Sequence, residues 1–190
     1  MTTRHVFIAM SLDGYIARED DSLDWLTPYH APDEDHGFDA FMASVDGLVM
    51  GSGTFRTVLR FGGDWPYAKP VIVLSHSLTR DDIPDALRTR VTLSRETPTA
   101  LMSRLDAEGF QHVYVDGGAV IRSFLQDGLI ADMEITLVPV LIGRGRGRKL
   151  FGEMDLATDI RLDQLRVRRF SSGLVLTRYA VSSPSSSKDA

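Results

Sequence analysis

The sequence contains no cysteine among its 190 residues. This absence excludes disulfide bridges, catalysis by a thiolate, and every zinc or iron–sulfur site that is built on cysteine. No apolar run approaches the ~20 residues that cross a bilayer, and the first residues, Met1 to His5, do not open a secretory signal. We therefore expect a cytoplasmic protein without membrane contact.

Lysine is also scarce. It occurs only at positions 69, 149 and 188, which leaves few places for a Schiff-base mechanism. The formal net charge of −5 gives no support for general attraction to nucleic acid. The five histidines, at positions 5, 30, 36, 76 and 112, form no H-E-x-x-H or comparable pair. We therefore expect a small-molecule ligand, no nucleic-acid partner and no metal site.

The composition is that of an ordinary globular protein, with 43% hydrophobic and 25% charged residues. At the usual ~150 residues per domain, the length predicts about one domain. We expect this domain over residues 1–181. Residues 182–190 are rich in serine and low in complexity, which predicts a disordered tail.

Hydrophobic periodicity predicts alternating strands and helices. Short apolar runs predict strands at residues 5–10, 47–51, 70–75, 91–93 and 112–115. Apolar side chains at helical spacing predict helices at 38–45, from 54 onward, at 98–108 and at 120–125. Residues 133–142 predict a longer strand broken at Pro139, and two late strands near 159–169 and 173–181 flank the hairpin signal Ser171-Ser172-Gly173. Residues 18–37 show no clean period and predict a long loop.

Strands that alternate with helices and then end in a β-hairpin predict a single α/β domain. The simplest arrangement is a mostly parallel central sheet, with helices on both faces and antiparallel strands at the C-terminal end.

Three of the predicted junctions between a strand and the next helix are small and polar: Gly51-Ser52-Gly53-Thr54, Ser75-His76-Ser77 and Asp116-Gly117-Gly118-Ala119. In an open α/β sheet, ligands bind beyond the carboxyl ends of the strands. Free N–H groups at a helix N-terminus favour anions, and glycine lets a phosphate approach the main chain. A tight turn explains each junction alone, but one ligand lying across several strand ends explains all three.

Standard nucleotide motifs are absent, since the sequence contains neither G-x-G-x-x-G nor the P-loop pattern. The cationic stretch Arg144–Lys149 has two interpretations. It could hold a phosphorylated substrate, or it could be a flexible loop or an element at a dimer edge.

Six short motifs follow one another along the chain: Ala9-Met10-Ser11-Leu12-Asp13-Gly14-Tyr15-Ile16-Ala17, Asp24-Trp25-Leu26, Val49-Met50-Gly51-Ser52-Gly53-Thr54-Phe55, Val73-Leu74-Ser75, Val115-Asp116-Gly117-Gly118-Ala119 and Pro139-Val140-Leu141-Ile142-Gly143. Over residues 4–180 they resemble the dihydrofolate-reductase-like superfamily, and most closely the RibD C-terminal-domain group of riboflavin-biosynthesis reductases. The resemblance implies a three-layer α/β/α fold. It also implies a homodimeric oxidoreductase that uses NADPH to reduce a C=N or C=O bond of a small heterocyclic or sugar-derived substrate.

The resemblance also assigns roles to residues. Gly117, Gly118, Ala119 and Val120 match the segment that cradles the pyrophosphate, and Gly51, Ser52, Gly53 and Thr54 match a second phosphate-contacting turn. Ser75 and His76 match the turn that usually holds the adenosine 2′-phosphate. Ala9 and Ile16 match positions that line the nicotinamide. Trp25 matches a wall of the active site, and Phe41 and Phe55 are further candidates for substrate binding.

Two departures from the family pattern matter. Relatives often carry arginine where Ser52 stands, which leaves the preference for NADPH resting on Ser75, His76 or Arg80, or relaxes it toward NADH. Asp116 replaces a small residue of some relatives and puts an acid near the phosphates unless its side chain points away.

Two carboxylates are candidate proton donors. Asp35 falls where folate reductases place their pterin-binding acid, and Asp13 belongs to the Ser11-Leu12-Asp13-Gly14 signature of the riboflavin-type branch. Each also has a structural interpretation, Asp35 as an acid at a helix N-terminus and Asp13 as a turn aspartate. The leading hypothesis is a reductase resembling 5-amino-6-(5-phosphoribosylamino)uracil reductase. The alternatives are a pterin reductase and a non-catalytic NADPH-binding protein. A fused zinc deaminase is excluded because its ligands include cysteine.

Overall fold

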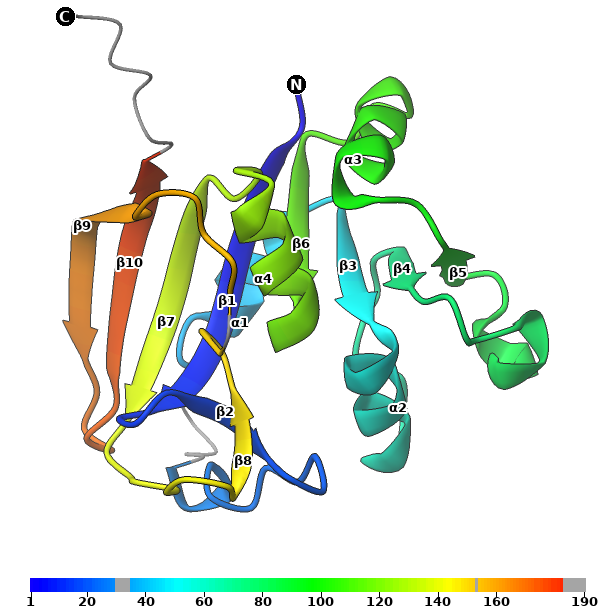
Figure 1. Cartoon of the computed structure of the whole chain (residues 1–190). Helices are drawn as coiled ribbons and strands as arrows, with labels where there is room; N and C mark the ends of the chain where they lie inside the picture. The colour runs from blue at the N-terminus through cyan, green and yellow to red at the C-terminus, as the bar shows by residue number, and fades with distance from the viewer. Residues whose placement is uncertain (30–34, 153, 183–190) are drawn as a thin grey trace, which may run out of the picture.

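The computed structural model describes residues 1–29, 35–152 and 154–182. Its main element is an eight-stranded sheet with the strand order β5-β4-β3-β6-β1-β7-β10-β9 (Figure 1). The six strands from β5 to β7 in this order are parallel, and β10 and β9 are antiparallel. The strands are β1 (Thr3–Ser11), β3 (Gly47–Gly51), β4 (Val71–Leu74), β5 (Val91–Ser94), β6 (His112–Asp116), β7 (Asp132–Val138), β9 (Arg161–Arg169) and β10 (Val175–Ser182).

Helices cover both faces of this sheet. Apolar side chains of α3 (Pro98–Ala107) and α4 (Gly118–Gln126) pack into one core cluster with the sheet, and those of α1 (Phe38–Ala43) and α2 (Ser52–Arg60) pack into another. A β-sheet buried on both faces accounts for strands that are apolar throughout, such as β3 and β4. The predicted three-layer α/β fold with a C-terminal antiparallel hairpin is confirmed.

A second, two-stranded sheet was not predicted. It pairs β2 (Tyr15–Arg18) with β8 (Gly147–Lys149) in antiparallel orientation. A Cβ atom at Gly147 would lie 2.3 Å from the Ala17 carbonyl oxygen, so only glycine permits this close pairing. Part of the cationic stretch Arg144–Lys149, for which a loop was one of the interpretations, is therefore a strand. Neighbouring residues did not predict it, because its partner lies about 130 residues away in the sequence.

Several predicted boundaries shift by a few residues. β3 has the predicted bounds, and β7 ends just before Pro139. The helix predicted at 38–45 ends at Ala43, although Val45 is still only 1% exposed. Three 3₁₀ helices, not predicted, are η1 (Thr27–Tyr29), η2 (Arg80–Asp82) and η3 (Asp85–Leu87). The last strand includes Ser182, one residue beyond the predicted domain end, and the rest of the predicted tail lies outside the described residues.

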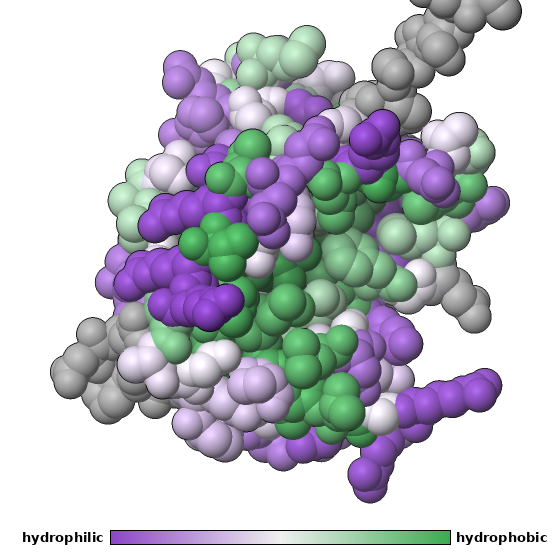
Figure 2. All heavy atoms as spheres, turned by 90° about the vertical axis from the view of Figure 1, so that its left-hand side faces the viewer, coloured by the Kyte–Doolittle hydropathy of each residue, from purple (hydrophilic) through white to green (hydrophobic). Residues whose placement is uncertain are grey.

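The edge strand β9 is exposed along all nine of its residues. Three of its apolar side chains lie on the surface: Leu162 is 38% exposed, Leu165 59% and Val167 48%. Figure 2 views the molecule from this side and shows hydrophobic side chains gathered on the surface. Among the described residues, no helix combines the length and the apolar character needed to cross a membrane.

Candidate active site

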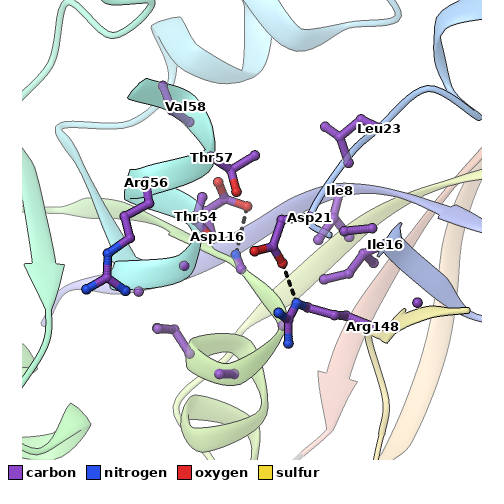
Figure 3. A pocket seen from close by; sticks show the side chains of 18 of the residues that line it. Ile8, Ile16, Asp21, Leu23, Thr54, Arg56, Thr57, Val58, Asp116 and Arg148 are labelled. Carbon is purple, nitrogen blue, oxygen red and sulfur yellow. Dashed lines mark hydrogen bonds and ion pairs between the residues drawn. The ribbon is translucent and has the colours of Figure 1, made fainter. Parts of the chain in front are cut away.

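A cavity of about 1180 Å³ opens at the edge of the sheet where the parallel strands end (Figure 3). Pockets for drug-sized ligands usually measure ~300–1,000 Å³, so this cavity has room for a larger molecule. One wall comes from the ends of β3 and β6 and the helices that follow them, and the opposite wall comes from β2 and β8. This is the edge at which ligands bind in open α/β sheets.

The N-termini of α2 and α4 meet at this cavity. Gly117 has a φ of +87°, and a Cβ atom there would lie 2.3 Å from Thr54 Oγ1, so the position needs glycine for both conformation and space. Gly51 in turn lies close to α4, since a Cβ atom there would lie 3.2 Å from a Val120 methyl group. The first N–H groups of each helix have no partner within the helix. The two helices thus offer a paired site for anions.

Most of the residues that the resemblance assigns to a coenzyme line this cavity. They belong to β1, β2 and the two junctions after β3 and β6: Ala9, Ile16, Gly51, Ser52, Gly53, Thr54, Gly117, Gly118, Ala119 and Val120.

Trp25 also lines the cavity and is only 4% exposed. Its indole Nε1 has no hydrogen-bond partner among the described residues.

The third polar junction lies apart from the cavity lining. Ser75 is buried, and its hydroxyl oxygen accepts hydrogen bonds from the N–H groups of Ser77 (3.2 Å) and Leu78 (3.0 Å), which stabilise the turn after β4. His76 in the same turn is exposed. Neither residue is among those that line the cavity.

Two of the three candidates for substrate binding are core residues instead. Phe55 is fully buried, and Phe41 packs on the rings of Phe7 and Tyr114. Both belong to the apolar cluster beneath α1 and α2, because they occupy the inward faces of those helices.

The charges around the cavity differ from those of the whole chain. Although the chain has a net charge of −5, five cationic side chains line the cavity against two acidic ones. The cations are Arg56, Arg60, Arg122, Arg148 and Lys149, and the acids are Asp21 and Asp116. The cavity therefore favours an anionic ligand.

Asp21 connects the two walls of the cavity. Its carboxylate accepts a hydrogen bond from Arg148 of β8 (Figure 3). It also accepts one from Arg60 of α2 at 3.4 Å. Sequence reasoning missed this contact, because Asp21 is one of several acids in a segment without a clear pattern.

Asp116 is a half-buried carboxyl group at the end of β6, on the floor of the cavity. Its Oδ1 accepts a hydrogen bond from the Gly117 N–H at 2.8 Å. Burial raises the pKa of Asp116 to about 6, against the opposing effect of that hydrogen bond. Strongly shifted carboxyl groups in a cleft are typical of functional sites. The sequence singled out this acid without assigning it a role.

Asp13 lies in the turn after β1, where it connects this turn to the loop after β7. Its carboxylate accepts hydrogen bonds from the Ser11 hydroxyl (2.7 Å) and from the N–H groups of Gly143 (2.7 Å) and Ile142 (3.1 Å). Burial raises the pKa of Asp13, but these hydrogen bonds outweigh it and lower the pKa to about 2. A carboxylate that stays ionised at neutral pH favours the structural interpretation.

We expect Asp13→Asn to destabilise the fold by about 1–3 kcal/mol, because one of the two backbone N–H groups then loses its acceptor. Thermal or urea unfolding measures this change. A variant that is as stable as the parent chain but slower in turnover would instead support a catalytic role for Asp13.

Asp35 also has a structural position. Its carboxylate accepts hydrogen bonds from the N–H groups of Gly37 (3.0 Å) and Asp39 (2.9 Å) at the start of α1, and these bonds lower its pKa. The side chain is exposed and is not part of the cavity lining.

Metal ligands do not converge at this cavity. Among residues 1–29, 35–152 and 154–182, no group of three or more histidine, aspartate or glutamate side chains is close enough to hold a metal ion.

A mostly parallel α/β sheet with helices on both faces and a cationic cavity at its carboxyl edge is typical of the dihydrofolate-reductase-like α/β fold. The model of the RibD C-terminal domain family matches residues 4–176, and the chain belongs to this family, whose members are reductase-like proteins of riboflavin biosynthesis.

Among curated proteins, the chain is similar to the uncharacterised protein YwjB of Bacillus subtilis (strain 168), with 33% identity over 83% of the chain and 87% of that protein. Among solved structures, it is similar to a Shewanella sp. PV-4 protein provisionally assigned to riboflavin biosynthesis. That match has 40% identity and a TM-score of 0.88, and it covers 96% of this chain and 100% of the other. The riboflavin biosynthesis reductase Rib7 of Saccharomyces cerevisiae shares the fold, with a TM-score of 0.66 and 16% identity over 95% of this chain and 90% of that one.

Proposed function

We propose that this protein is an NADPH-dependent oxidoreductase of the riboflavin-biosynthesis type, resembling 5-amino-6-(5-phosphoribosylamino)uracil reductase. The observation that carries the proposal is the meeting of two helix N-termini, at Gly117 and Thr54, in a cavity lined by five cationic side chains. A dinucleotide carries the negative charges that such a cavity attracts.

The chain's residues fit this coenzyme. The N–H groups of Gly118, Ala119 and Val120 at the start of α4 would hold the pyrophosphate, with Ser52 and Thr54 of α2 beside them. Ala9 and Ile16, from β1 and β2, would line the nicotinamide end. When bound, the coenzyme would supply a hydride to a C=N or C=O carbon of the substrate.

In this proposal Asp116, which lines the same cavity, is the proton donor. Hydride addition builds negative charge on the nitrogen or oxygen next to the reduced carbon, and a nearby acid relieves it. With a pKa of about 6, roughly a tenth of Asp116 is protonated at pH 7, and this fraction rises as the pH falls. Trp25 would form the substrate wall, where its indole Nε1 is buried and has no hydrogen-bond partner among the described residues.

A direct test measures coenzyme binding and turnover separately. Calorimetry with NADPH and NADH should give binding to the purified chain, and NADPH absorbance should fall when the aminouracil ribosyl phosphate is added. Turnover with dihydrofolate alone would indicate the pterin reductase, although no observation favours it, since Asp35 lies outside the cavity lining. Tight binding without turnover would indicate a non-catalytic NADPH-binding protein. No binding of either coenzyme would refute the proposal.

Arg56 is the residue that we propose for selecting the phosphorylated coenzyme. It lies one helical turn after Ser52, the position at which relatives often carry arginine, and it lines the same cavity (Figure 3). Within the described residues its guanidinium makes no hydrogen bond or ion pair. The pKa of Asp82, which lies close to the turn that contains Ser75, is lowered mainly by hydrogen bonds from Thr79. The charge of Arg56 lowers it to a smaller extent.

Arg56→Gln should therefore weaken NADPH binding by about ten- to a hundredfold, because it removes a charged hydrogen bond worth about 1.5–3 kcal/mol. NADH binding should be unchanged and serves as the internal control. Arg88→Gln, which removes an arginine outside the cavity that pairs with Asp85, should leave both affinities unchanged. An equal loss for both coenzymes would show that Arg56 does not read the additional phosphate.

The proposal includes a cytoplasmic homodimer. The exposed apolar side chains of the edge strand β9 support association with a second copy through this strand. Light scattering that gives the mass of a single chain would contradict the dimer.

A further inference from the structure

Two histidines face each other at the end of the sheet opposite the cavity. His5 lies in β1, and His112 is the first residue of the neighbouring parallel strand β6. His5 Nε2 and His112 Nδ1 are 3.1 Å apart, with the ring planes inclined by 40°. Both residues lie near the beginnings of strands whose ends form the cavity, so this pair has no part in the site described above.

The His5 ring is held in one orientation. Its Nδ1–H donates a hydrogen bond to Asp132 Oδ2 at 2.9 Å, and Arg178 Nη2 donates to the same oxygen at 3.1 Å. The His5 and Asp132 side chains are each 13% exposed, so the contact is largely shielded from water. With the proton on Nδ1, the lone pair of His5 Nε2 points at His112. A carboxylate behind an imidazole is the arrangement that orients metal-binding histidines.

We propose that His5 and His112 form a binding site for a divalent transition metal ion such as Zn²⁺ or Cu²⁺. Two imidazole nitrogens that bind one tetrahedral ion at ~2.0–2.1 Å are separated by about 3.3 Å. The observed distance of 3.1 Å is close to this value. Imidazole is a preferred ligand for both ions.

Binding requires a change of tautomer and a rotation of the rings, because the ion lies to one side of the line that joins the two nitrogens. In the metal-free protein, His112 Nδ1–H donates to His5 Nε2. In the complex, the His112 proton moves to its Nε2, and both facing nitrogens offer lone pairs to the ion. His112 is exposed, so water can carry this proton and can occupy the remaining coordination positions.

Two carboxylates lie next to the pair, one of which also accepts a hydrogen bond from Arg178. The Asp132 carboxylate lies behind His5, and Asp46 lies beside His112, where its Oδ2 accepts the His112 and Gln111 N–H groups at 2.8 Å each. Because the described residues contain no group of three or more ligand side chains, the site has two protein ligands. It would bind more weakly than a four-ligand structural site, and it would fasten β1 to β6.

Titration of the tag-free protein with ZnCl₂ and CuCl₂ at neutral pH, followed by calorimetry, tests the site. We expect one ion per chain and an increase in the unfolding temperature with metal concentration, since a ligand that binds only the folded state stabilises it. His112→Gln changes an exposed side chain and should weaken binding by about tenfold or more. Asp132→Asn should weaken it by about 10- to 100-fold, as loss of a carboxylate behind a metal ligand typically does.

The matched control is His76→Gln, which removes an exposed histidine far from the pair in sequence and should retain the parental affinity. The proposal is overturned if the parent chain binds neither ion, or if His112→Gln and His5→Gln bind as tightly as the parent. In that case the two rings form only a hydrogen bond.

Discussion

Replacement of Ala119 by glutamate is expected to raise the dissociation constant for NADPH about a hundredfold. Ala119 is the exposed second residue of α4 and lines the cavity. A carboxylate at this position would occupy the helix N-terminus where we propose that the pyrophosphate binds. Like charges brought together cost several kcal/mol, and about 3 kcal/mol corresponds to about two orders of magnitude in affinity.

The same substitution should not destabilise the fold. An acid in the first turn of a helix interacts favourably with the helix dipole, by about 0.3–1 kcal/mol. Loss of coenzyme binding at an unchanged or raised unfolding temperature thus separates the two effects.

Ala100→Glu is the matched control, because it adds the same charge to the first turn of α3, outside the cavity lining. It should bind NADPH like the parent chain. If Ala119→Glu binds NADPH equally well, the pyrophosphate does not lie at α4.

Asp116→Asn is expected to slow hydride transfer by about 10²–10⁴-fold, the usual contribution of a general acid. The parent chain should be fastest at acidic pH and should lose activity as the pH rises through about 6, because the carboxyl group then loses the proton that it donates. The variant should show no such decline. Stopped-flow measurement of NADPH oxidation across this range gives both results.

The Asp116→Asn variant should be slower than the parent chain but more stable. A carboxyl group with a folded pKa of about 6 and a lower unfolded pKa makes the folded state less stable as the pH rises from about 4 to 6. Above this range the ionised carboxyl group destabilises the folded state by its full amount, about 3 kcal/mol at most. The substitution removes the charge, while its amide oxygen can still accept from Gly117. Unfolding at neutral pH should thus show a more stable variant, and unfolding near pH 4 should show little difference.

An exposed acid provides the comparison. Asp85 lies outside the cavity lining, and Asp85→Asn should change neither the rate nor its pH dependence. If Asp35→Asn removes the rate and Asp116→Asn does not, the proton donor is Asp35, and the pterin reductase becomes the better hypothesis.

Features that depend on neighbouring residues were predictable. β3 has the predicted bounds, because an apolar run between two glycines specifies both a buried strand and its ends. The start of α4 was predictable for a similar reason, since Gly117-Gly118 separates a buried strand from a periodic helix. The same local patterns marked these junctions as candidate ligand sites, and the resemblance to the RibD C-terminal-domain group assigned them to a coenzyme.

Features that depend on distant partners were not predictable. β8 is short and cationic, and only its pairing with β2 makes it a strand. Asp13 bonds to Ile142 and Gly143, about 130 positions further along the chain. Helical spacing correctly predicted the inward face of α1 that carries Phe41, but it gave no means to tell a core aromatic from a residue at a substrate wall.

The amino-acid sequence alone determined the layer architecture, the order of the elements and the glycine-rich turns, because hydrophobic period and backbone freedom are properties of adjacent residues. Tertiary structure alone decided which charges share a cavity. It set Asp116 on the cavity floor and Asp21 between Arg60 and Arg148, and it brought His5 to His112. Charge interactions and burial depend on distances between residues that are remote in the chain, and those distances exist only after the sheet has formed.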